Sequence, residues 1–107
     1  MRLHVKHFLK IIGVKFKMSN LMVYTIFDSV SGEYGLPFFA NNDMVAQRQC
    51  CITLSSLPVN YWKEFSLFQI GRYDSDKGEI YPLDEHIEVS DGMDLINVFE
   101  NFYKEVK

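Results

Sequence analysis

The hydrophobic pattern of the chain begins with a short run of β-branched and aromatic residues. Residues 22–27 have the sequence MVYTIF, apolar on both faces, which predicts a strand. Residues 28–33 predict a turn, because Asp and Ser side chains bond back to the backbone and Gly32 accepts a positive φ. Residues 34–39 are expected to return beside the first strand, since Pro37 forces an extended path.

A helical spacing of apolar residues follows this strand pair. Residues 41–43, Asn-Asn-Asp, are typical of a helix N-cap, and the helix is expected to stop by Pro58. The positions predicted to be buried recur at helical intervals or lie beside that stripe: Ala46, Cys50, Leu54, Leu57, Val45 and Ile52. Gln47 and Arg48 are predicted to face outward.

Two further strands are predicted to form a hairpin. Residues 65–73, FSLFQIGRY, predict a long strand, and residues 74–78, Asp-Ser-Asp-Lys-Gly, predict the turn. Residues 79–81 begin the returning strand, which Pro82 interrupts and confines to an edge of the sheet.

The last segment of the chain predicts a second helix. Asp91 is its expected cap, and Lys104 and Lys107 lie at its negative end. Its apolar stripe recurs at helical spacing: Leu95, Phe99, Phe102 and Val106. Together these elements predict an α+β fold class, with a small, mainly antiparallel sheet and one or two helices packed on one face.

Composition agrees with one folded domain. The chain has 107 residues, of which 48% are hydrophobic and 23% charged, and this balance excludes disordered, collagen-like and disulfide-rich classes. Aromatic residues make up 15%, enough to fill a small core well. No stretch approaches ~20 uninterrupted apolar residues, so no membrane span is predicted.

Basic residues are concentrated at the start of the chain. Residues 1–17 contain five of them and no acidic residue: Arg2, Lys6, Lys10, Lys15 and Lys17. The predicted organisation is a basic leader at residues 1–21 followed by a single α+β domain at residues 22–107. The leader is either an amphipathic helix suited to a membrane surface or a nucleic acid, or a disordered or added segment.

The rest of the chain is acidic. Residues 18–107 contain six basic and fourteen acidic residues, a net charge of −8. Such a domain does not supply a general phosphate-binding surface, because phosphate binding needs clustered Lys and Arg. Charge therefore favours a protein or another basic surface as the partner.

No motif for catalysis, a cofactor or a metal emerges. Cys50 and Cys51 are adjacent and lack a second ligand pair, which favours reduced thiols in a cytoplasmic protein. The Asp74-x-Asp76-x-Gly78 spacing departs from a calcium loop at the sixth position, where Glu79 replaces the required Gly. His86 lies among acidic residues and is predicted to belong to a solvated acidic loop.

Aromatic residues offer one further hypothesis. Those considered as stacking faces for single-stranded nucleic acid are Tyr61, Trp62, Phe68, Tyr73 and Tyr81. Few basic residues lie among them, and strand aromatics in a small protein usually belong to the core. Core packing is therefore the favoured interpretation.

Several short motifs follow one another along the chain in a characteristic order. The first stretch is IFDSVSGEYGLPFFANNDMVAQR, residues 26–48, and the second is FSLFQIGRYDSDKGEI, residues 65–80. This ordered set resembles the small non-structural protein of gokushoviruses, single-stranded DNA phages of the Microviridae, over about residues 22–83. The chain departs from that pattern at residues 1–21, at Cys50 and in the linker 57–64, and its C-terminal helix is longer.

The resemblance implies a non-virion phage accessory protein that assists single-stranded DNA synthesis and genome packaging in the host bacterial cytoplasm. Its partner would be the phage replication initiator or the procapsid protein. The side chains expected to contact that partner are Arg48 on the first helix and Asp74, Asp76 and Lys77 at the hairpin. The alternative is a direct single-stranded DNA-binding protein that uses the five basic residues of the leader together with exposed aromatics.

Overall fold

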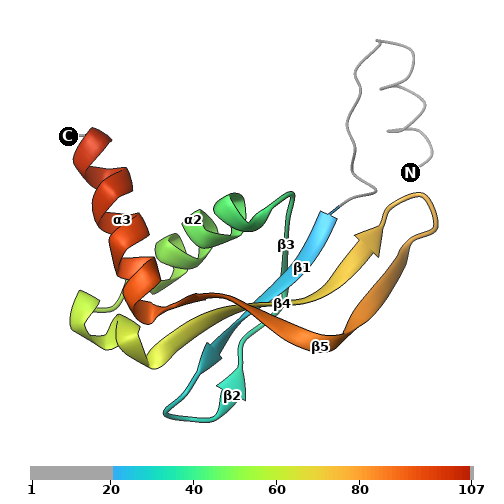
Figure 1. Cartoon of the computed structure of the whole chain (residues 1–107), viewed down its shortest axis with the longest axis horizontal. Helices are drawn as coiled ribbons and strands as arrows, with labels where there is room; N and C mark the ends of the chain where they lie inside the picture. The colour runs from blue at the N-terminus through green and yellow to red at the C-terminus, as the bar shows by residue number, and fades with distance from the viewer. Residues whose placement is uncertain (1–20, 107) are drawn as a thin grey trace.

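The computed structural model describes residues 21–106 (Figure 1). Its elements, in chain order, are β1 (Leu21–Asp28), β2 (Glu33–Tyr34), β3 (Phe38–Ala40), α2 (Asp43–Leu54), the 3-10 helix η2 (Val59–Glu64), β4 (Phe65–Asp74), β5 (Glu79–Asp91) and α3 (Gly92–Val106). The leader predicted at the start of the chain lies outside these residues, except for Leu21, with which β1 begins.

The sheet is antiparallel throughout and has the order β2-β1-β4-β5, with β3 also paired to β1. The two turns that connect its hairpins contain Gly32 and Gly78, with φ of 74° and 65°. Both glycines occupy the left-handed region that their turns require. The predicted α+β class is confirmed, and β5 lies at the edge to which Pro82 confined it.

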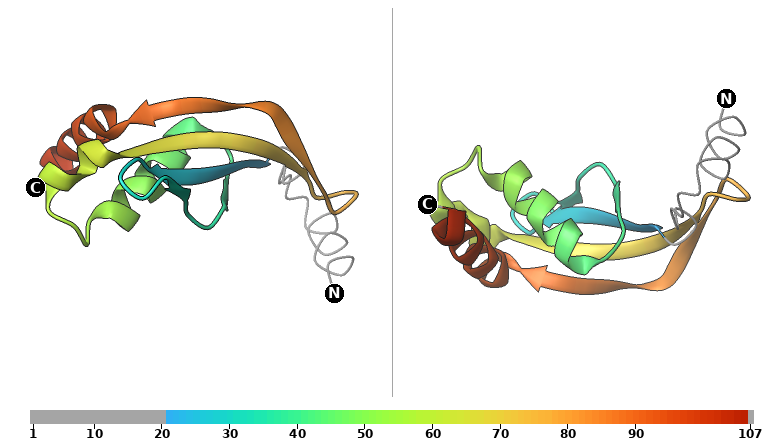
Figure 2. Two further views of the ribbon diagram at one scale, coloured as in Figure 1. Left: turned by 90° about the horizontal axis from the view of Figure 1, so that it is seen from below. Right: turned by 90° about the horizontal axis from the view of Figure 1, so that it is seen from above.

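Helix α2 covers one face of the sheet. Figure 2 shows it in front of the strands when the molecule is seen from above, and behind them when it is seen from below. Asn42 is the N-cap, because its side chain accepts a hydrogen bond of 2.9 Å from the backbone N–H of Val45. The Tyr24 hydroxyl donates to Asp43 Oδ1 at 2.7 Å and so ties β1 to the start of the helix.

The core lies between this sheet face, the two helices and η2. Its largest fully buried apolar side chains are Tyr24, Trp62, Leu67 and Leu95. Three of the stripe positions predicted on α2, Ala46, Cys50 and Leu54, are buried in it.

The prediction that the other residues of this stripe are buried is wrong. Ile52 is 61% exposed, and Val45 and Leu57 are also exposed, whereas Cys51 is buried. The cause is the position of α3, which packs on the Cys51 side of α2 and brings the Leu95 carbonyl within 3.4 Å of the Cys51 thiol. Leu57 lies beyond the end of the helix, so the helical spacing no longer applies to it.

Helix α3 begins with a reciprocal cap. The backbone N–H of Asp94 donates to Asp91 Oδ1 at 2.8 Å, and the backbone N–H of Asp91 donates to Asp94 Oδ2 at 3.2 Å. Phe99 packs on Trp62 with 4.9 Å between ring centroids. The remaining positions of the predicted stripe, 102 and 106, lie outside the residues whose side chains are described.

The acidic loop predicted around His86 is in fact part of β5. This strand runs through Pro82 to Asp91, with register shifts at two points where it pairs with β4. The acidic side chains remain exposed because β5 is the edge strand. Gln47, expected to face outward, is half-buried and donates from Nε2 to Ser90 Oγ of β5 at 2.7 Å.

Candidate functional site

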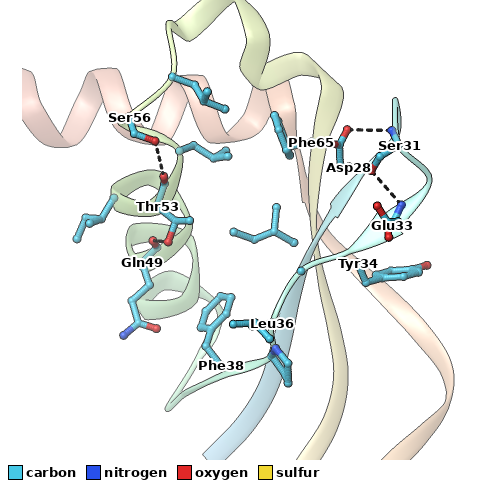
Figure 3. Close-up of a pocket in the computed structure, with 16 residues that line it drawn as sticks. Asp28, Ser31, Glu33, Tyr34, Leu36, Phe38, Gln49, Thr53, Ser56 and Phe65 are labelled. Atoms are coloured by element: carbon cyan, nitrogen blue, oxygen red, sulfur yellow. Dashed lines mark hydrogen bonds between the residues drawn. The ribbon is translucent and has the colours of Figure 1, made fainter.

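A groove of about 1000 Å³ lies between α2 and the chain segment that links β1 to β3 (Figure 3). Its floor is apolar and includes Ile26 of β1, Leu54 of α2 and Phe65 of β4. Residues distant in sequence thus meet at one site, because α2 packs back across β1, the strand that precedes this linking segment.

Two bulky aliphatic side chains stand exposed on opposite sides of this groove. Leu36 is 91% exposed in the link between β2 and β3, and Ile52 is 61% exposed on α2. Single exposed apolar side chains are common on protein surfaces. Several of them around one concave, apolar floor are typical of a binding site.

The hydroxyl groups on the α2 side of the groove are bonded to backbone carbonyls of the same stretch of chain. Thr53 Oγ1 donates to the Gln49 carbonyl at 3.0 Å, and Ser56 Oγ donates to the Thr53 carbonyl at 3.4 Å. Figure 3 shows these three residues along the helix, with Leu36 and Phe38 nearby at the lower end of the site. The hydroxyls on this side therefore add little directed polarity, and the apolar floor dominates.

The charged residues that line the groove are both acidic, Asp28 and Glu33. They lie near Ser31 in the turn between β1 and β2, away from Leu36 and Phe38 (Figure 3). Asp28 Oδ1 accepts hydrogen bonds from the backbone N–H groups of Val30 at 3.0 Å and Ser31 at 3.4 Å, which fixes this carboxylate in place. The groove therefore has an apolar end and an acidic end.

A second surface is the sheet face that α2 leaves uncovered. Phe27 contacts Tyr34 and Phe68, with ring centroids 4.7 Å and 6.1 Å away, and Tyr34 also contacts His86 at 5.6 Å. These rings come from β1, β2, β4 and β5 and form an aromatic cluster across the sheet. Thr25, on the same face by its register with Phe68, is buried although no helix covers it.

A separate ring pair lies at the other end of the same face. Phe39 and Tyr73 have ring centroids 5.3 Å apart; Phe39 pairs with Val23 of β1, and Tyr73 pairs with Leu21. Arg72, by contrast, pairs with Met22 and Tyr81 and so belongs to the helix-covered side. No Lys or Arg of β1, β4 or β5 is in register with the aromatic cluster.

The residues predicted to contact a protein partner are not brought together. Arg48 is exposed on α2, whereas Asp74, Asp76 and Lys77 form the hairpin tip, at the far end of the sheet from the helices (Figure 1). Asp74 has a local structural role, since its Oδ1 accepts from the backbone N–H groups of Asp76 at 2.9 Å and Lys77 at 3.3 Å. The five basic residues of the leader lie outside the described residues.

The aromatic residues considered for stacking are also dispersed. Trp62 is buried in the core and its Nε1 donates to the Leu57 carbonyl at 3.3 Å, so it cannot stack on a base. Tyr81 lies under the Arg72 guanidinium, 4.6 Å from its ring centroid. Phe68 and Tyr73 lie on the uncovered face. Sequence reasoning thus identified two aromatics of that face and missed Phe27, Tyr34 and Phe39.

The two free cysteines are buried. Burial, together with the neighbouring Cys51, raises the pKa of the free Cys50 thiol to about 12, and burial raises that of Cys51 to about 11, so both stay protonated near neutral pH. In residues 21–106, no helix has the length and apolarity needed to cross a membrane.

Comparison with protein families gives a match over most of the described residues. The family model described as Phage ORF5 protein matches residues 21–95, which include the groove, the aromatic cluster and the hairpin tip. Neither a curated protein nor a solved structure matches the chain.

Proposed function

The chain belongs to the phage ORF5 protein family, and from this we propose that it is a non-virion accessory protein that assists production and packaging of a single-stranded phage genome by binding another protein. The partner is the phage replication initiator or the procapsid protein, and the encounter takes place in the host cytoplasm. The role is binding and not catalysis.

The observation that carries this proposal is the groove between α2 and the β2–β3 link. Its floor is apolar, Leu36 and Ile52 are exposed beside it, and the charged side chains that line it are acidic. A phosphate backbone would be repelled by Asp28 and Glu33, whereas a protein surface with apolar and basic side chains fits both ends.

A pair of matched substitutions in a phage genome tests this function. Ile52→Glu places a charge in the groove, and Met44→Glu makes the same change at a side chain of α2 that is 62% exposed and outside the groove. We expect Ile52→Glu to lower the yield of DNA-filled particles at least tenfold while double-stranded replicative DNA still accumulates. Met44→Glu should leave the yield within twofold. Equal yields from the two variants, with both proteins folded, would contradict the proposal.

Direct binding of single-stranded DNA is the second candidate, favoured by the uncovered aromatic cluster. Tyr34 is 50% exposed there, beside Phe27 and Phe68, and exposed rings on an open sheet can stack on bases. Because this face presents no in-register Lys or Arg, the electrostatic contribution would have to come from the basic residues of the leader.

Fluorescence anisotropy with a labelled oligothymidine separates the two candidates. DNA binding through the aromatic cluster predicts an affinity that falls steeply with salt and that weakens in both Tyr34→Ser and a Lys10→Glu, Lys15→Glu double variant. Binding of a protein partner predicts no measurable affinity for the oligonucleotide at 150 mM salt, about physiological ionic strength.

A further inference from the structure

The groove between α2 and the β2–β3 link has a polarity along its length. At one end Leu36 and Phe38 present apolar surface, and at the other Asp28 and Glu33 present negative charge. Resting on the proposed function, we infer that the groove binds a short extended peptide segment of a partner protein, in which bulky aliphatic or aromatic side chains stand next to lysine or arginine.

The apolar half of this preference follows from the exposed side chains. Leu36 loses almost no surface to its own chain, being 91% exposed, and Ile52 rises from α2 beside the same floor. A partner's aliphatic or aromatic side chain that lies on the apolar floor would remove both Leu36 and Ile52 from water at once. A polar segment would leave them exposed and gain nothing from the floor.

The basic half follows from the acidic end. Asp28 is held by the Val30 and Ser31 backbone N–H groups, so its carboxylate is already oriented before any ligand binds. The backbone N–H of Glu33 donates to Ser31 Oγ at 3.3 Å, which fixes the start of β2 beside it. Two carboxylates with no cation among the lining residues complement a lysine or arginine of the ligand.

The shape favours a chain segment over a compact ligand. The groove is bordered by α2 on one side and by residues 33–38 on the other, and Figure 3 shows the apolar and acidic groups spread along it instead of converging on one point. An extended peptide can place successive side chains at both ends, as in other groove-binding modes.

The experiment is a selection from a random ten-residue peptide library against the immobilised full chain. We expect the selected peptides to combine Leu, Ile, Phe or Trp with Lys or Arg, and their affinity, measured by anisotropy, to fall at least tenfold in Leu36→Glu. Met44→Glu is the matched control, since Met44 is an exposed apolar residue of α2 outside the groove, and it should change the affinity less than twofold.

Charge reversal tests the acidic end separately. Selection against Glu33→Lys should favour peptides without Lys or Arg. Glu100→Lys alters an exposed acid on α3, a helix that contributes no residue to the groove, and should leave the selected pattern unchanged. Peptides without the apolar-basic pattern, or binding that is equal in the groove variants and their controls, would overturn the inference. If Ile52→Glu still abolishes filled particles in that case, the groove binds a partner of other chemistry and the proposed function stands.

Discussion

Gly92, the first residue of α3, lies against the backbone of η2. A Cβ atom at this position would be 2.1 Å from the Trp62 carbonyl oxygen and 2.4 Å from the Lys63 Cα. Carbon and oxygen atoms normally approach to only ~3.3 Å, so an alanine here requires one of the two backbones to move by about 1 Å. Gly92→Ala is therefore expected to be strongly destabilising.

The magnitude follows from what has to move. Displacing η2 would disturb Trp62, which is 1% exposed, and its ring contact with Phe99. Displacing the start of α3 would break the reciprocal cap of Asp91. Overpacking costs about 1–3 kcal/mol and occasionally more, and with backbone on both sides we expect about 3 kcal/mol. For a domain of this size that corresponds to a fall in Tm of roughly 12–24 °C.

The sign of the effect makes this a sharp test. Helix propensity alone predicts that replacing Gly by Ala stabilises a helix by up to ~1 kcal/mol. Gly35→Ala is the matched control, because a Cβ there meets only the Ile26 carbonyl oxygen at an ordinary 3.5 Å. Urea unfolding followed by the fluorescence of Trp62 measures both variants. A Gly92→Ala protein as stable as Gly35→Ala would refute the close approach of α3 and η2.

Three other perturbations have defined outcomes. Gly78→Val should lower the free energy of unfolding by ~1–2 kcal/mol in urea titrations, because the residue has a φ of 65°, and an unchanged midpoint would place the turn elsewhere. Burial raises the pKa of Cys50 to about 12 and of Cys51 to about 11 in the folded protein. As pH rises, the thiols of the unfolded chain therefore ionise at a lower pH than those of the folded chain. Stability should be unaffected by the two thiols below pH 8 and fall from about pH 9 towards 11, with a weaker fall when both are alanine; identical pH profiles would contradict this. Arg48→Ala should change stability by less than ~0.5 kcal/mol and, if this exposed side chain contacts the partner, should lower the yield of filled particles. Normal yields from Arg48→Ala and from a charge-reversed hairpin tip would exclude both surfaces as contacts for the partner protein.

The parts of the fold that depend on local chemistry could be predicted from the sequence. The Asn42 and Asp91 caps and the turns at Gly32 and Gly78 all lie where hydrogen bonding and backbone conformation within four or five residues require them. The strand after Pro82 was missed, because its exposed acidic residues lack the apolar alternation of a half-buried strand.

The buried face of α2 shows why the rest could not be predicted. Apolar residues occupy much of the circumference of this helix, so periodicity alone does not say which of them meet the core. Docking of α3, more than forty residues later in the chain, decides between Cys51 and Ile52. The groove has the same origin, since its walls and floor come from segments between Ile26 and Phe65 that only the tertiary fold brings together.

Two of the three residues wrongly predicted to be buried with the α2 stripe lie in the proposed binding site. Ile52 and Leu57 were expected in the core, and both instead line the groove, exposed. A hydrophobic pattern reflects every surface that a chain keeps from water, against its own core or against a partner, and local rules fail most often at functional sites. Val45 makes this argument specific: it was mispredicted in the same way, yet it lies outside the groove. If burial by a partner accounts for Ile52, then Ile52→Glu should impair function and Val45→Glu should not.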